Sequence, residues 1–157
     1  MVTTHRDFLP AGLRLFLLVE AVGMLVLVGV LLAVDDEVSP TMKLGILAAM
    51  LAIQLALLFM HAHITAKPDG VTLGYWPLFR RTFRYRDLVS AEAVMVDAMR
   101  DWHGWGIKGR SRSEQGMLLG GASRHGIALT TRDGRRYVVT SREPVDDLVA
   151  TIVARVG

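Results

Sequence analysis

The chain has 157 residues, of which 52% are hydrophobic and 21% are charged, and its formal net charge is +3. This length corresponds to about one domain, and a small net charge with interspersed acids argues against a nucleic-acid-binding protein. The chain contains no cysteine, which excludes disulfides, thiolate nucleophiles and zinc sites built on sulfur.

An apolar run over residues 13–34 predicts a first transmembrane helix. Its only ionisable residues are Arg14, at the edge, and Glu20. About 20 apolar residues cross a hydrocarbon core about 30 Å thick, so the run is long enough to span it. A cleaved signal peptide is the competing interpretation, but its apolar core is usually shorter, and here a second span follows at once.

A second run of similar length, 43–64, predicts a second helix. The residues between the runs, 35–42, read DDEVSPTM, which is long enough to connect two antiparallel helices. This connection is acidic, whereas basic residues flank the two runs on their other sides. The positive-inside rule then places both termini in the cytoplasm. We therefore predict a cytoplasmic segment over 1–12 and a transmembrane hairpin over 13–64, in a multi-pass protein of the inner membrane.

Glu20 is the polar residue of the first span that requires an explanation. A charged group near the middle of the membrane costs about 2.5–3.5 kcal/mol on insertion scales. An antiparallel second helix brings Gln54 or His61 to a similar depth, where a hydrogen bond or an ion pair would offset this cost. Glu20 then either fixes the helix register, or is held neutral by desolvation, or senses protons or cations. His61 and His63 do not predict a metal site, because residues two apart on a helix point in nearly opposite directions.

Small residues recur in the second span at Gly45, Ala48, Ala52 and Ala56. This spacing lets helix backbones approach closely in lipid. The stripe predicts packing against the first span or, alternatively, contact with a second copy of the chain or with a partner protein.

After a predicted linker at 65–69, the sequence changes to a β pattern. Alternating and β-branched segments predict strands at 71–76, 81–88, 89–96, 126–131 and 135–140, although the alanines of 89–96 also allow a helix. Asp133 and Gly134 between the last two segments predict a hairpin turn. Pro144 opens a final amphipathic helix. We therefore predict an α+β protein in which residues 70–157 form an antiparallel β domain closed by one helix.

The stretch DWHGWGIKGR contains Gly104, Gly106 and Gly109 in the spacing G-x-G-x-x-G. A dinucleotide-binding fingerprint needs a buried strand before the first glycine and a helix that begins at the loop. Here the preceding residues are polar and no helical period follows. We interpret the two glycines around Trp105 as parts of a bent or bulged strand, and we predict no cofactor.

The order of these segments resembles bacterial pleckstrin-homology-like (PH-like) domains that follow one or two transmembrane helices. The matching segments are G-W-G-I-K at 104–108, the strand–Asp-Gly–strand segment at 126–140 and the helix from Pro144. Lys108 stands where arginine is commoner. The resemblance spans roughly residues 70–156. It implies a seven-stranded, partly open antiparallel barrel with one end capped by the C-terminal helix, and it implies no reaction.

The sequence contains no recognisable catalytic constellation, so we predict a non-enzymatic, membrane-anchored module that mediates protein interaction or scaffolding. An alternative is binding of anionic lipid, because basic residues near a membrane surface gain about 1 kcal/mol each. The residues that would contact headgroups are Arg80, Arg81, Lys108, Arg110 and Arg112. A second alternative is an accessory or ion-sensing membrane protein that uses Glu20. The predicted partners are membrane lipids and a protein or second copy, but no nucleic acid.

Overall fold

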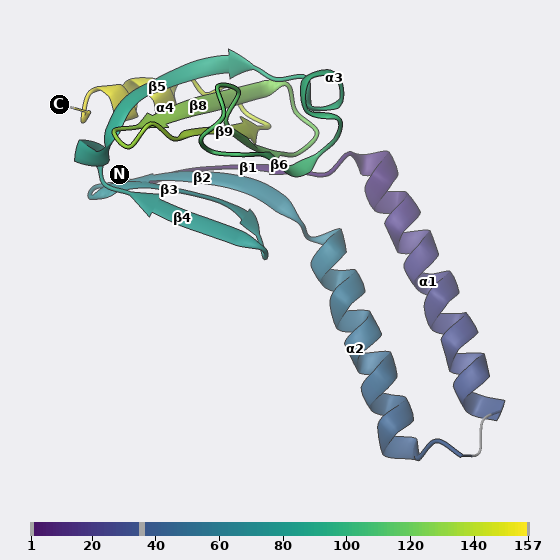
Figure 1. Ribbon diagram of the computed structural model, residues 1–157. Coiled ribbons are helices and arrows are strands. Elements are labelled where there is room, and N and C mark those ends of the chain that lie inside the picture. The colour runs from purple at the N-terminus through teal and green to yellow at the C-terminus, as the bar shows by residue number, and fades with distance from the viewer. Residues whose placement is uncertain (1, 35–36, 157) are drawn as a thin grey trace. The chain divides into compact units, whose positions relative to one another are not determined.

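The computed structural model describes residues 2–34 and 37–156 (Figure 1). Asp35 and Asp36, in the predicted acidic connection, lie outside the described residues. In chain order, the elements are β1 Thr3–Phe8, α1 Ala11–Val34, α2 Pro40–Leu58, β2 His61–Lys67, β3 Gly70–Trp76, β4 Phe79–Phe83, the 3₁₀ turn η1 Tyr85–Asp87, β5 Leu88–Met95, α3 Ala98–Trp102, β6 Gly106–Gly109, β7 Met117–Gly120, β8 His125–Thr131, β9 Arg136–Ser141 and α4 Asp146–Val153. They form two compact units: α1 with α2, and β1 with the elements from β2 to α4.

Helices α1 and α2 confirm the prediction of two helices that are long and apolar enough to cross a membrane. The two helices pack against each other as a hairpin (Figure 1). The most apolar window of each helix is not buried inside the chain, which is compatible with a membrane protein. At its start, α2 has Pro40 in the first helical turn, and the hydroxyl of Ser39 accepts a hydrogen bond from the backbone N–H of Met42.

The second helix is shorter than the predicted span 43–64, because it ends at Leu58 and strand β2 begins at His61. Along β2, buried residues alternate with half-buried ones. The buried residues are Ala62, Ile64 and Ala66. This alternation with a period of two is typical of a strand. In the sequence, however, these residues directly follow an apolar helix, so the pattern predicts that the helix continues through them. The strand also occupies most of the predicted linker 65–69.

The segment 1–12 contains a strand, β1, that the sequence analysis does not predict. It pairs antiparallel with β2, and Phe8 lies opposite His61. The helical hairpin is therefore inserted between two neighbouring strands of one sheet. Asp7 holds β1 in place, because its carboxylate, on a residue only 2% exposed, accepts hydrogen bonds from the backbone N–H and the hydroxyl of Ser123, both at 2.9 Å.

The strands form two separate open sheets, which corrects the expectation of one partly open, seven-stranded antiparallel barrel. One sheet has the order β1-β2-β3-β4 and the other the order β5-β8-β9-β7-β6. Strands β7 and β9 run parallel, whereas the other pairs are antiparallel. Figure 1 shows the sheets as two layers, with β2 against β9. The buried core includes Ile64, Leu73, Ile127, Leu129 and Val139.

The C-terminal part follows the sequence-based prediction closely. Strands β8 and β9 pair antiparallel around the turn that contains Asp133 and Gly134. Helix α4 packs against β5 and β2 and buries Leu148 and Ile152. Both elements depend on local signals, namely a turn dipeptide and an apolar stripe of helical period, and such signals survive tertiary packing.

The glycine segment lacks the strand–loop–helix order of a dinucleotide-binding fingerprint. Helix α3 precedes Gly104, and the short strand β6 at the edge of the five-stranded sheet follows it. Trp105 lies before β6 rather than in the predicted bent strand. Together with Trp102 it packs on one face of the five-stranded sheet, against a cluster of buried hydrophobic residues. That face carries Leu118, Ala128 and Val138.

Candidate functional site

The outer face of the four-stranded sheet carries positive charge without a compensating acid. The alternation of side chains and the strand register define which residues share this face. They are Thr4, Arg6, Phe8, His61, His63, Thr65, Lys67, Thr72, Gly74, Trp76, Arg80 and Thr82. Within this set of described residues, Arg6, Lys67 and Arg80 are cationic and none is aspartate or glutamate. We call this surface the basic face.

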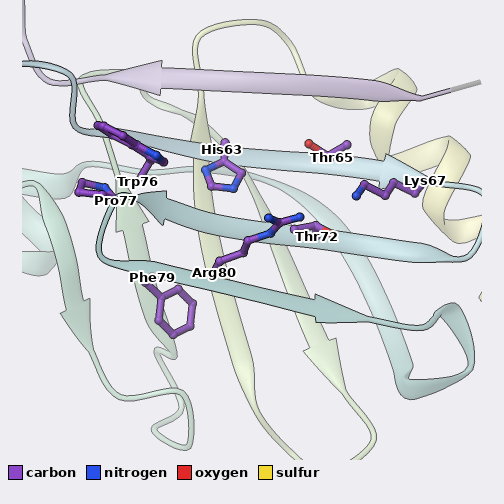
Figure 2. Close-up of a pocket in the computed structure, with 8 residues that line it drawn as sticks. All are labelled: His63, Thr65, Lys67, Thr72, Trp76, Pro77, Phe79 and Arg80. Carbon is purple, nitrogen blue, oxygen red and sulfur yellow. The ribbon is translucent and has the colours of Figure 1, made fainter. Parts of the chain in front are cut away.

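A cavity of about 270 Å³ lies on the basic face. It is lined by His63, Thr65, Lys67, Thr72, Trp76, Pro77, Phe79 and Arg80. Figure 2 shows the guanidinium of Arg80 lying over β3, between His63 and Thr72. In the same view, the side chain of Lys67 extends along the sheet towards Thr72. Two cations from different strands therefore reach the same part of the cavity.

The ring of His63 lies flat against the sheet because its neighbour on β3 has no side chain. A Cβ atom on Gly74 would lie 2.5 Å from Cε1 of His63 and 2.5 Å from the carbonyl oxygen of Phe79. Burial, followed by the charges of His61, Arg80 and Arg6, lowers the pKa of His63 below its ordinary value of 6.5. The imidazole is therefore mainly neutral at pH 7, in surroundings of positive potential.

Two threonine pairs bring hydroxyl groups to the same face. The hydroxyls of Thr4 and Thr65 lie 3.0 Å apart, as do those of Thr72 and Thr82. A pair of hydroxyls has two protons and uses one in its mutual hydrogen bond. Each pair therefore keeps one proton that can be donated to a ligand.

An aromatic cluster marks one end of the basic face. The ring of His61 lies between those of Phe8 and Trp76, with centroid distances of 4.9 Å and 6.1 Å. Trp76 is 45% exposed, and Leu78, in the turn that follows, is 65% exposed. Two residues separate Phe8 from α1, and two separate α2 from His61. This end of the sheet is therefore the end from which both apolar helices leave the domain.

The structure separates two adjacent arginines of the predicted headgroup set. Arg80 lies on the basic face, whereas Arg81 points to the opposite side of β4. Nη1 of Arg81 donates a hydrogen bond of 2.9 Å to the hydroxyl of Tyr137, and its guanidinium lies over the rings of Phe83 and Tyr137. Consecutive residues of a strand point to opposite faces, so only one of the two can take part in this surface.

The other three predicted headgroup residues belong to the five-stranded sheet. Lys108 lies on edge strand β6, and Arg110 and Arg112 are exposed in the segment that follows it. The hydroxyl of Thr131, and to a smaller extent Arg135 and Arg112, lower the pKa of Asp133 below its ordinary value. Arg112 thus lies near an acid of its own sheet, and none of the three contributes to the cavity on the basic face.

The structure brings Glu20 and Gln54 together between α1 and α2. Nε2 of Gln54 donates a long hydrogen bond of 3.4 Å to Oε2 of Glu20. His61, the other predicted contact, belongs to strand β2 and not to α2. The contact agrees with a role of Glu20 in helix register, and proton or cation sensing by Glu20 stays a prediction.

Replacing Gln54 with methionine, which has a similar shape, removes the donor that reaches Glu20 from α2. We expect the hairpin to lose roughly 0.6 kcal/mol, the average for interhelical hydrogen bonds in membranes. Replacing Glu20 with glutamine keeps an acceptor opposite Gln54 and should change stability less. Thermal unfolding of the detergent-purified protein measures both. A larger loss in Glu20→Gln than in Gln54→Met would show that the charge itself matters.

The small-residue stripe does not lie in the interface between the two helices. Gly45, Ala48 and Ala52 are exposed, and only Ala56 is half-buried. A Cβ added to Gly45 would meet nothing within 4 Å. Of the two predicted uses of the stripe, contact with a second copy or a partner therefore stays a prediction, and packing against α1 involves Ala56 at most.

His61 and His63 share one face, contrary to the expectation for a helix. On strand β2 their ring centroids lie 5.8 Å apart. Among the described residues, no group of three histidines or acids is placed to hold a metal ion. The sequence signal that was missed is the alternation of HAHITAK, in which every second residue is polar.

None of the protein-family models, curated proteins or solved structures that were compared with the chain matches it. The resemblance to PH-like domains therefore stays a prediction, and function has to be argued from the basic face itself.

Proposed function

We propose that the chain is a membrane-anchored module that binds anionic lipid headgroups through the basic face, on the cytoplasmic side of a bacterial inner membrane. The observation that carries the proposal is the register of the four-stranded sheet. It pairs Phe8 with His61 and His61 with Trp76, so an exposed indole lies at the end of the sheet that is connected to both helices.

Chain connectivity supports this assignment. Two extended residues span at most about 7 Å, so the first residues of β2 stay close to the end of α2. If α2 crosses the membrane, Trp76 and Leu78 are then within reach of the headgroup region. Tryptophan is enriched there because its ring is apolar and its N–H is polar.

The charge distribution also supports binding of anionic lipid through the basic face. Lys67 and Arg80 lie on the same face as Trp76 and have no acidic neighbour on that face. Each basic residue close to an anionic surface gains about 1 kcal/mol. If both helices cross the membrane, the pairing of β1 with β2 keeps both flanks of the hairpin on one side, in agreement with the positive-inside rule.

The test uses the full chain in lipid nanodiscs, with Trp102 and Trp105 replaced by phenylalanine so that Trp76 is the only tryptophan. Lipids that carry a spin label at the headgroup quench nearby indoles. We expect stronger quenching of Trp76 when phosphatidylglycerol is added to phosphatidylcholine. Arg80→Gln should remove most of this increase.

Arg81→Gln is the matched control. It removes the same charge from the adjacent residue, whose guanidinium lies against Tyr137 on the other side of the strand. We expect it to leave the lipid dependence of quenching unchanged and to lower stability by about 1 kcal/mol through the lost hydrogen bond. Equal effects of the two variants on quenching, or no lipid dependence at all, would contradict the proposal.

Scaffolding of a partner protein is a second candidate, and the open edge of the five-stranded sheet favours it. Strand β5 ends the sheet, and its last residue, Met95, is 70% exposed. Val94 and Trp102 line a cleft of about 320 Å³ beside it. Exposed methionine next to an unpaired strand edge suits the addition of a strand from another protein.

A photo-crosslinking amino acid placed at Met95 tests this candidate in cells. We expect one reproducible protein adduct at this position, and none at the exposed Ala150 on α4. The same adducts at both positions would argue against a partner on the β5 edge.

A further inference from the structure

We propose that the cavity on the basic face is a binding site for a phosphate group, held between Arg80, Lys67 and the hydroxyls of Thr65 and Thr72. The phosphate is either part of a lipid headgroup or part of a soluble compound. This inference deepens the proposed function, since it assigns a defined anion site within the same surface.

The donors around the cavity suit a tetrahedral oxyanion. The guanidinium of Arg80 offers several N–H donors in one plane, and Lys67 adds a mobile ammonium. Both groups reach the middle of the face, where Thr72 lies (Figure 2). The threonine pairs at Thr65 and Thr72 each keep one donatable proton. The cavity therefore gathers cationic and neutral donors from three strands.

The ring of His63, which lines the cavity, is a further feature that suits an anion. Nδ1 of His63 is buried and has no hydrogen-bond partner among the described residues. Burial of the ring, and then the charges of His61 on its own strand, Arg80 of β4 and Arg6 of β1, lower the pKa of His63 and disfavour its protonated form. A bound dianion would cancel part of this positive potential and make protonation of His63 easier.

Gly74 makes room for this arrangement. Any side chain at this position would meet the ring of His63 and the backbone at Phe79. The ring would then be pushed out into the cavity. The missing side chain at Gly74 therefore leaves space for the imidazole of His63 beside Arg80 and the threonines.

The experiment titrates inorganic phosphate into the full chain held in nanodiscs of phosphatidylcholine alone. The C–H signals of His63, followed by NMR, report binding and also give the pKa of this ring. We expect saturable shifts and a higher pKa of His63 in the bound state. Arg80→Gln and Lys67→Gln should each weaken binding by about tenfold, the loss typical of one charge-assisted hydrogen bond.

Arg84→Gln is the control, because it removes an equal charge from an exposed residue just after β4 that does not line the cavity. Its phosphate affinity should equal that of the unaltered chain. The absence of saturable shifts, or an equal loss in Arg84→Gln, would overturn the proposal whatever the quenching of Trp76 shows.

A second arm identifies the source of the phosphate. Phosphatidic acid is added to the nanodiscs, and the titration with inorganic phosphate is repeated. Competition from the lipid supports a headgroup as the ligand. Unchanged phosphate affinity supports a soluble phosphate compound, and in that case the site exists while the proposed lipid binding is contradicted.

Discussion

Replacing Asp7 with alanine should lower the free energy of unfolding of the sheet domain by about 3 kcal/mol, because the buried carboxylate accepts two hydrogen bonds from Ser123. A hydrogen bond to a charged group contributes about 1.5–3 kcal/mol. The loop between β7 and β8, which contains Ser123, also lies very close to Asp7. A Cβ atom on Gly121 of this loop would be 2.5 Å from Cγ of Asp7. Denaturant unfolding of the detergent-purified chain, followed by tryptophan fluorescence, measures the loss.

Arg6→Ala is the matched control for this variant. Arg6 lies next to Asp7 on β1 but is exposed on the opposite face. Its replacement should change stability by no more than about 0.5 kcal/mol, as is usual for surface positions. In Asp7→Ala, hydrogen exchange of β1 amides should also become faster. Similar stability of the two variants would show that Ser123 does not hold β1 in place.

Raising the pH from 8 to 11.5 should destabilise the unaltered chain by about 2 kcal/mol more than a Tyr75→Phe variant. Burial, aided by the charge of Asp7, raises the pKa of Tyr75 from 10.0 to about 12. Above pH 10 the unfolded chain loses this phenolic proton while the folded chain keeps it. The folded state then binds more protons, so the free energy of unfolding falls as the pH rises.

Unfolding curves of both proteins at pH 8 and at pH 11.5 test this prediction. At pH 8 the phenol is protonated in both states, so the difference between the two proteins reports only the loss of the hydroxyl. The additional difference at pH 11.5 belongs to the ionisation of Tyr75. If the two proteins lose equal stability between these pH values, the phenol is more accessible to water than its burial indicates.

Elements with strong local signals could be predicted from the sequence. Helix α1, the hairpin at Gly134 and helix α4 each depend on residues that are close in the chain, and their existence follows from length, turn chemistry or period. Strand β1 has no such signal. It is a strand because β2 offers it an edge and Ser123 binds its aspartate, and both partners are distant in sequence.

The candidate site was predicted only in part, for the same reason. Arg80 is in the predicted set, but the sequence pattern gives Lys67 no role in a site and indicates His63 only as a poor metal ligand. The error began where α2 ends, because a strand of period two that directly follows an apolar helix looks like its last turns. With β2 in place, register decides that Arg80 shares a face with His63 and that Arg81 does not.

By itself, the sequence determined that the chain has two long apolar helices, followed by a region rich in β-strands. The length of an apolar run and the alternation of apolar and polar residues are both properties of the local chain. Tertiary structure alone decided that the helices are inserted between β1 and β2, that the sheets stay open, and which basic residues converge. These outcomes depend on which strand edges pair and on their register, and pairing energy comes from residues far apart in the chain.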